Sequence, residues 1–144
     1  MAKKTSAWPA LLTARALVVD AIETRLSKAG LPELAWYDVL WTLEQAEGSR
    51  LRMHELAAQT VITRSNMTRL VDRLETAGLV MRERDAEDRR GAFARLTAAG
   101  KHMRARMWKV YGPSIAELVD GHLSDAEAAA MRACLLRIIE AVRA

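Results

Sequence analysis

One continuous stretch, from Thr63 to Thr97, constrains the fold more than any other part of the chain. In its first half, apolar residues recur at i, i+3, i+4 and i+7, namely Met67, Leu70, Val71 and Leu74. This spacing predicts a short helix with one buried stripe. The opposite face must then point outward, with side chains that can donate to phosphates or reach base edges in a DNA major groove. These outward residues are Arg64, Ser65, Thr68, Arg69, Asp72 and Arg73.

The sequence also marks both ends of this helix and the segment that follows it. Thr63 can cap the N-terminus with its hydroxyl, and Gly78 stands where a left-handed residue is favoured after a helix. Two extended runs follow, Leu79 to Arg84 and Arg89 to Leu96, joined by the charged turn at 85–88. A helix followed by a basic hairpin predicts a winged helix-turn-helix.

This stretch resembles the corresponding part of the MarR family of bacterial transcriptional regulators. The run RDAEDRR at 84–90, followed by LTAAG at 96–100, resembles the family's wing signature. Upstream, RLVDRLE at 69–75 and GLV at 78–80 resemble its recognition helix and the exit from that helix. The order and lengths of the other helices extend the resemblance, more weakly, over almost the whole chain.

The rest of the chain is expected to be helical apart from one short strand. Ser6 can cap a first helix, which ends at Gly30 and Pro32. Before the recognition helix, the sequence then predicts a helix at 33–47, an edge strand at 50–52 and a helix at 53–60. Thr97 can cap a long helix from Ala98, in which Gly112-Pro113 predicts a kink or break. A capping box, SDAE at 124–127, precedes the last helix. The expected fold class is mainly α with a small β-wing.

The first and last helices carry broad apolar faces that would need a partner surface. We therefore expect a single domain, 1–144, in which 6–32 and 98–144 form a dimerisation region and 33–97 form the DNA-binding unit. The resemblance also implies a homodimer, and packing within one chain is the alternative. A twofold dimer would hold two recognition helices ~34 Å apart and would select a pseudo-palindromic operator.

Composition permits this interpretation without requiring it. The chain has 144 residues, of which 51% are hydrophobic, enough for one core, and its net charge is +4. From Thr63 to Thr97 there are eight arginines and six acids, so DNA binding must depend on where the charges lie. The single cysteine, Cys134, excludes an internal disulfide and fits a reducing cytosol. No stretch reaches the roughly 20 apolar residues of a membrane helix, and no signal peptide is evident, so a cytoplasmic location is expected.

The helix phase predicts which residues would read DNA. Residues at the helix start would lie nearest the bases, where Arg64 can grip a guanine edge and Asn66 suits adenine. At the wing tip, Arg89 or Arg90 would enter the minor groove. The full expected set is Thr63, Arg64, Ser65, Asn66, Thr68, Arg69, Arg73, Arg84, Arg89 and Arg90.

Acidic residues among these arginines are expected to have a different role, because a carboxylate near phosphate repels it. Asp85 and Asp88 would fix the hairpin and orient one arginine, with an ordinary solvated turn as the alternative. For Arg73 the alternative is a pair with Asp72 or Glu75 that keeps it from DNA.

The resemblance implies a repressor that is released by a small anionic or phenolic molecule, held in a crevice between the dimer helices and the DNA-reading unit. Trp8 and Arg15 are seven residues apart and share a helical face, so they can stack an aromatic ring and hold its carboxylate. Trp36, Tyr37 and His102 are further candidates. Core packing is the alternative for each of them.

Rival functions have weaker support. An enzyme or metal protein is not favoured, because His54, His102 and His122 lack ligand-like spacing and no catalytic motif is present, so no cofactor or metal is expected. A winged-helix module that binds proteins instead of DNA is one alternative. A thiol-based redox sensor is another, but Cys134 lies on an apolar stripe, where a buried and inert thiol is expected. Ala92 and Ala94 depart from the family, which usually has larger aliphatic residues there, and this bears on the stiffness of the wing.

Overall fold

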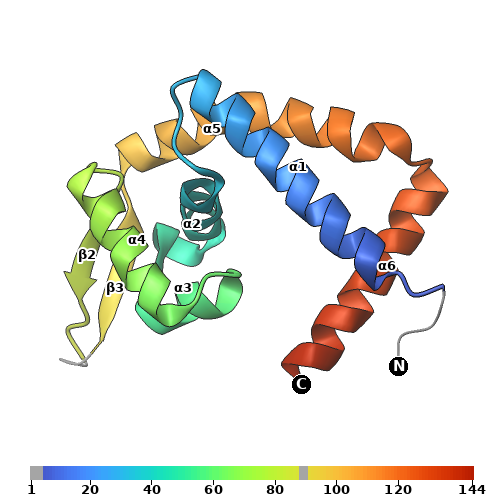
Figure 1. The fold of residues 1–144 in the computed structure, drawn as a ribbon. Coiled ribbons are helices and arrows are strands. Elements are labelled where there is room, and N and C mark those ends of the chain that lie inside the picture. Colours follow the sequence, from blue (N-terminus) through green and yellow to red (C-terminus); the bar gives the residue numbers. More distant parts are fainter. Residues whose placement is uncertain (1–4, 88–90) are drawn as a thin grey trace. The chain divides into compact units, whose positions relative to one another are not determined.

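The computed structural model describes residues 5–87 and 91–144 and shows a mainly helical chain with one small sheet (Figure 1). The helices are α1 (Trp8–Lys28), α2 (Leu34–Gln45), α3 (Met53–Gln59), α4 (Arg64–Thr76), α5 (Ala98–Leu118) and α6 (Asp125–Arg143), with short 3₁₀ turns η1 (Glu47–Ser49) and η2 (Asp120–His122). The fold class expected from the sequence is confirmed. The chain forms two compact units, one of Glu23–Val110 and one of the described residues up to Ile22 with Tyr111–Ala144.

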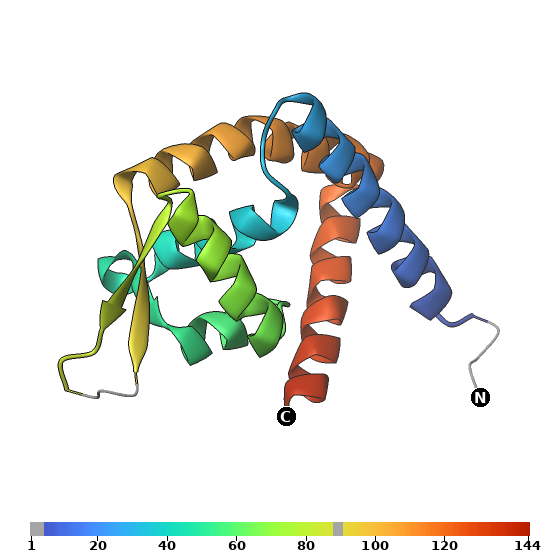
Figure 2. The same cartoon turned by 60° about the vertical axis from the view of Figure 1, so that its left-hand side comes forward.

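The larger unit contains a three-stranded antiparallel sheet made of β1 (Arg50–Arg52), β2 (Val80–Arg84) and β3 (Ala92–Leu96). Its strand order is β1-β3-β2, so the short strand expected at 50–52 does pair with the wing. Figure 2 shows β2 and β3 side by side as a hairpin. Along this hairpin, Val80 pairs with Leu96 and Arg84 with Ala92.

The core of the larger unit lies between the helices and one face of this sheet. The predicted stripe of α4 is buried, and it packs in one cluster with residues of α2, α3 and the sheet. The cluster comprises Val39, Leu40, Leu43, Leu56, Met67, Leu70, Val71, Leu74, Leu79, Val80, Ala94 and Leu96. Burial of one side of α4 fixes its rotation about its own axis, and its opposite side faces outward.

Local signals set the ends of α4 where the sequence predicts them. The Thr63 hydroxyl accepts a hydrogen bond from the Asn66 backbone N–H at 3.4 Å, and Gly78 has a φ of +76°. A left-handed φ favours glycine, which has no Cβ to clash with the following carbonyl. The chain therefore leaves α4 abruptly and enters β2 at Val80.

The other unit includes the first part of α1, the end of α5 and α6. The capping box at the start of α6 is confirmed, with Glu127 N–H donating to the Ser124 hydroxyl at 3.1 Å and Ser124 N–H donating to the Glu127 carboxylate at 3.0 Å. Several large apolar side chains of α1 and α6 are exposed in the single chain. They are Trp8, Leu12, Leu17, Met131, Leu136, Ile138, Ile139 and Val142.

Of the kink or break expected at Gly112-Pro113, the break does not occur: α5 continues through Pro113 to Leu118. Proline removes one donor from a helix, but the bonding pattern resumes beyond it, with Val119 N–H donating to Ile115 O at 2.9 Å. The second helix is also shorter than the expected 33–47, since Ala46 already has an extended backbone.

Candidate nucleic-acid interface

The outward face of α4 carries polar and basic side chains. Thr63, Arg64, Ser65, Asn66, Thr68 and Arg69 are all exposed. The Thr68 hydroxyl donates a hydrogen bond to Arg64 O within the helix at 3.2 Å. Its oxygen can therefore act toward a ligand only as a hydrogen-bond acceptor. Among the described residues, neither Arg64 nor Arg69 forms an ion pair with an acid. Their guanidinium groups are therefore available to an anionic partner.

A small pocket lies beside this face, between the first turns of α3 and α4. Its volume is about 210 Å³. It is lined by Met53, His54, Ala57, Arg64, Met67 and Thr68. The concave surface therefore adjoins the residues that the sequence assigns to DNA.

Arg73 lies differently from the other basic residues of α4. Its guanidinium is 3.4 Å from the carboxylate of Glu33, which immediately precedes α2. The alternative expected from the sequence, a pair with Asp72 or Glu75, is therefore wrong about the partner. Both of those acids bind Arg82 of β2 instead. Sequence spacing missed these pairs because they join residues of different elements.

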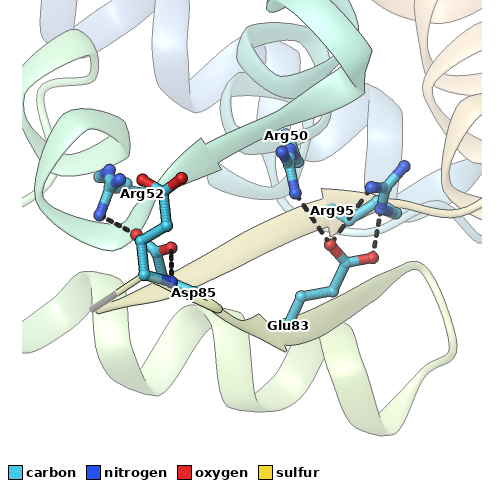
Figure 3. Close-up of polar contacts among 6 residues, drawn as sticks. Arg50, Arg52, Glu83, Asp85 and Arg95 are labelled. Carbon is cyan, nitrogen blue, oxygen red and sulfur yellow. Dashed lines mark hydrogen bonds and ion pairs between the residues drawn. The ribbon is translucent and has the colours of Figure 1, made fainter. Parts of the chain in front are cut away.

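Asp85, expected to organise the wing, is buried at the end of the hairpin strand β2. Its carboxylate forms an ion pair with Arg52 and accepts a hydrogen bond from Glu87 N–H at 3.0 Å (Figure 3). Its backbone N–H donates to Gly91 O at 3.2 Å. A Cβ on Gly91 would lie 3.1 Å from the Arg52 guanidinium, so a larger residue there would crowd the pair. Asp85 thus links the hairpin to β1, and a purely solvated turn is wrong for this residue.

A second set of charges crosses the sheet on the face that points away from the core. Glu83 accepts hydrogen bonds from Arg95, and Arg50 lies 3.4 Å from the same carboxylate (Figure 3). Arg50 and Arg52 also lie over the Phe93 ring, 4.3 and 4.9 Å from its centre. The sequence pattern did not point to this cluster, although alternation along three paired strands places all five residues on one face.

The pKa of Glu83 reports on these contacts. The hydrogen bond from Arg95 holds this pKa below its ordinary value of 4.5, and Arg50 acts in the same direction. An acid with a lowered pKa stabilises the folded state above its ordinary value, and this contribution is lost as pH falls through the lowered pKa. The contacts across the sheet are therefore intact at neutral pH.

The rest of the wing can be placed only in part. Arg84 is exposed at the end of β2, opposite Ala92. Asp88, Arg89 and Arg90 lie outside the described residues. Ala94, which departs from the family pattern, is fully buried against the core.

The residues proposed for a ligand are distributed over both units. In the larger unit, Trp36 is half-buried, His102 is exposed, and Tyr37 is buried between Trp41 and Trp108, with ring centres 6.4 and 5.9 Å away. Burial raises the pKa of Tyr37, and Arg104 opposes this effect. Trp8 and Arg15 are exposed on α1 in the other unit.

Cys134 is exposed in the single chain, so the expectation of a buried thiol is wrong. A guanidinium nitrogen of Arg137 lies 3.3 Å from its sulfur. Met131, Leu136, Ile138 and Ile139 on the same helix are exposed as well. The stripe was correctly located on the helix, but none of the described residues covers the thiol.

The described residues form neither a metal-ion site nor a membrane-spanning helix. Within 5–87 and 91–144, no three His, Cys, Asp or Glu side chains are grouped to hold a metal ion. The helices described there include none with the length and hydrophobicity that crossing a membrane requires.

Comparison with known proteins shows which family the chain resembles. A protein-family model described as "MarR family" matches residues 29–91, which include α2, α3, α4 and β2. The HTH-type transcriptional regulator FarR of Neisseria gonorrhoeae is 28% identical over 110 residues, which are 76% of this chain and 70% of FarR.

Two solved structures from Streptomyces coelicolor are similar over nearly the whole chain. AbsC, a MarR family transcriptional regulator, superimposes with a TM-score of 0.90 at 30% identity and covers 99% of this chain and 97% of its own. Sco3205, another MarR family regulator, was solved in complex with DNA. It has a TM-score of 0.88 at 29% identity, over 94% of this chain and 85% of its own.

Proposed function

Because this chain belongs to the MarR family of transcriptional regulators, we propose that it is a homodimeric repressor that binds a pseudo-palindromic operator. In this proposal a small aromatic or anionic ligand releases it from DNA. Family membership makes the protein a DNA-binding regulator and not an enzyme. The repressor role, the dimer and the ligand are the parts that we infer.

The observation that carries this function is the exposed polar face of α4 beside the wing. Arg64 grips a guanine edge with two hydrogen bonds, Asn66 suits adenine, and Arg69 follows one turn later. The N–H groups at the start of α4 favour phosphate. At the wing, Arg84 is the last residue of β2, and in this proposal Arg89 or Arg90 enters the minor groove. The ion pair of Asp85 with Arg52 supports its role in holding that hairpin.

The exposed apolar side chains of α1 and α6 support the homodimer. A cluster of large apolar residues in water is unfavourable, and a second copy of the chain can cover it. A twofold axis then sets two α4 helices ~34 Å apart, one turn of DNA. Sedimentation at micromolar concentration should give twice the 16.0 kDa mass of one chain, and a monomer would contradict the proposal.

Replacing Arg64 with alanine should weaken operator binding by about 1 to 3 kcal/mol and relax the preference at one base position. The operator can first be found by sequencing the genomic fragments that the purified protein retains. Gel shifts at moderate salt on this operator and on single-base variants then measure both effects. Arg90→Ala tests the wing in the same assay, and unchanged binding in both variants would contradict the assignment.

Release by a ligand requires that the ligand bind the arrangement unable to hold DNA better than the competent one. The proposed contacts are Trp36, Tyr37 and His102 in the larger unit and, separately, Trp8 and Arg15 on α1 in the other unit, since each set combines an aromatic ring with a basic side chain. Titration with salicylate should quench tryptophan fluorescence and loosen operator binding over the same concentration range. If neither signal changes for a series of aromatic acids, this ligand class is wrong.

A further inference from the structure

Arg82 lies on the face of the wing sheet that looks toward α4. In the pairing of β2 with β3, Val80 lies opposite Leu96, and Arg82 lies opposite Ala94. The apolar residues Val80, Ala94 and Leu96 belong to the core. Since side chains alternate along a strand, Arg82 projects to the same side as Val80. Its side chain is only 27% exposed. A basic side chain of the wing is therefore held near the recognition helix.

Four contacts join Arg82 to α4. Its Nη1 lies 2.7 Å from Asp72 Oδ1 and 3.1 Å from Glu75 Oε1, and its Nη2 donates to Thr68 O at 3.3 Å. Its backbone N–H donates to Glu75 Oε2 at 2.9 Å. One residue of β2 thus contacts α4 from Thr68 to Glu75, along about two helical turns.

The acidic partners of Arg82 affect DNA binding because Asp72 and Glu75 are the only two acids of α4. Asp72 follows Thr68 by four residues and Arg69 by three, so it shares their outward face. Both carboxylates are substantially exposed, 59% for Asp72 and 43% for Glu75. Without a cation beside them, they would repel the phosphates that approach the exposed face of α4.

We propose that Arg82 is a positioning residue for DNA binding, which neutralises Asp72 and Glu75 and ties the wing strand to the recognition helix. This inference rests on the proposed DNA-binding function. Arg82 acts through α4 and does not contact phosphate, because its guanidinium donors are directed at the helix. It differs in this from Arg64 and Arg69, whose side chains form no ion pair with any described acid.

Arg82→Gln removes the cation and leaves both carboxylates exposed to DNA. The variant should bind the operator on the order of tenfold more weakly at low salt, because like charges then face each other. The loss should shrink as salt is raised, since these carboxylates are solvent-exposed and screened. Lys101→Gln is the matched control, because it removes one positive charge from an exposed position of α5. It should bind within about twofold of the wild type.

The variant Arg82→Gln, Asp72→Asn, Glu75→Gln separates neutralisation from direct contact. If Arg82 acts by neutralising the acids, removing their charges should restore the wild-type affinity or exceed it. If Arg82 instead contacts phosphate, affinity stays low and the salt slope falls by about one unit, and the proposal is overturned. Recovery of this kind is not expected from a residue that only maintains the fold.

Two further measurements keep the outcomes distinct. Circular dichroism of each variant shows whether it is folded, and if Arg82→Gln is not, Arg82→Lys replaces it. Lysine keeps the positive charge but lacks the planar guanidinium with its paired donors. Arg82→Lys should therefore bind the operator less than about threefold more weakly than the wild type. A wild-type chain that binds no DNA would refute the proposed function. A wild type that binds, with Arg82→Gln unchanged, would refute only the role of Arg82.

Discussion

Gly100→Ala should destabilise the folded chain by about 3 kcal/mol or more. A Cβ at this position would lie 2.1 Å from Leu79 O and 2.7 Å from Leu96 Cδ1, far closer than such atoms approach. The Leu79 carbonyl cannot move away freely, because it accepts a hydrogen bond from Thr97 N–H at 3.1 Å. The first turn of α5 would therefore have to shift from the start of the wing. Urea unfolding followed by circular dichroism measures the change.

A neighbouring position provides the control for this prediction. Ala99 is exposed in the same turn of α5, so Ala99→Ser should change the free energy of unfolding by no more than about 0.5 kcal/mol. Equal unfolding midpoints for Gly100→Ala and the wild type would mean that α5 does not approach Leu79 this closely. The interpretation of Gly100 as a close-packing residue would then be wrong.

Leu74→Ala should cost about 2 to 5 kcal/mol of stability, because Leu74 is fully buried in the core cluster. The truncation leaves a cavity under the recognition helix and removes the contacts that hold its rotation. Operator binding should fall with the folded fraction in the same urea series. An unfolding midpoint equal to that of the wild type would contradict the burial of this face.

Arg69→Ala is the matched variant on the opposite face of the same helix. Arg69 is exposed, so its loss should leave stability within about 0.5 kcal/mol while lowering operator affinity. The pair of variants separates the two faces of α4 by their effects. If Arg69→Ala destabilised the chain as much as Leu74→Ala, the division of α4 into a core face and a DNA face would be wrong.

The features of α4 that were predictable are those with a local cause. Spacing over two turns identifies Met67, Leu70, Val71 and Leu74 as one stripe, and the structure buries all four. Capping of α4 by Thr63 requires only that its side-chain oxygen stand three residues before the backbone N–H of Asn66. These properties depend on the residue's immediate neighbours, and so a single sequence contains the information.

Pairings between distant elements were not predictable in the same way. Arg73 was expected in the DNA-binding set, with acids of its own helix as the alternative partners, and it contacts Glu33, forty residues away. The ion pair of Arg52 with Asp85 and the contacts of Arg82 also join residues from different elements. Charged side chains are abundant in the sequence, and each has several possible partners. Only the packing of strands against helices selects among them.

The sequence by itself determined the buried stripe, the N-terminal cap and the outward face of α4, the capping box of α6 and the hairpin, because the spacing of apolar residues and local hydrogen bonding produce each of these. Tertiary structure alone decided that Arg82 faces α4, that Asp85 is buried beside Arg52, and that Cys134 is uncovered in one chain. The physical reason is that burial and ion pairing depend on which surfaces meet, and that depends on the register of β1, β2 and β3 and on the packing of the core.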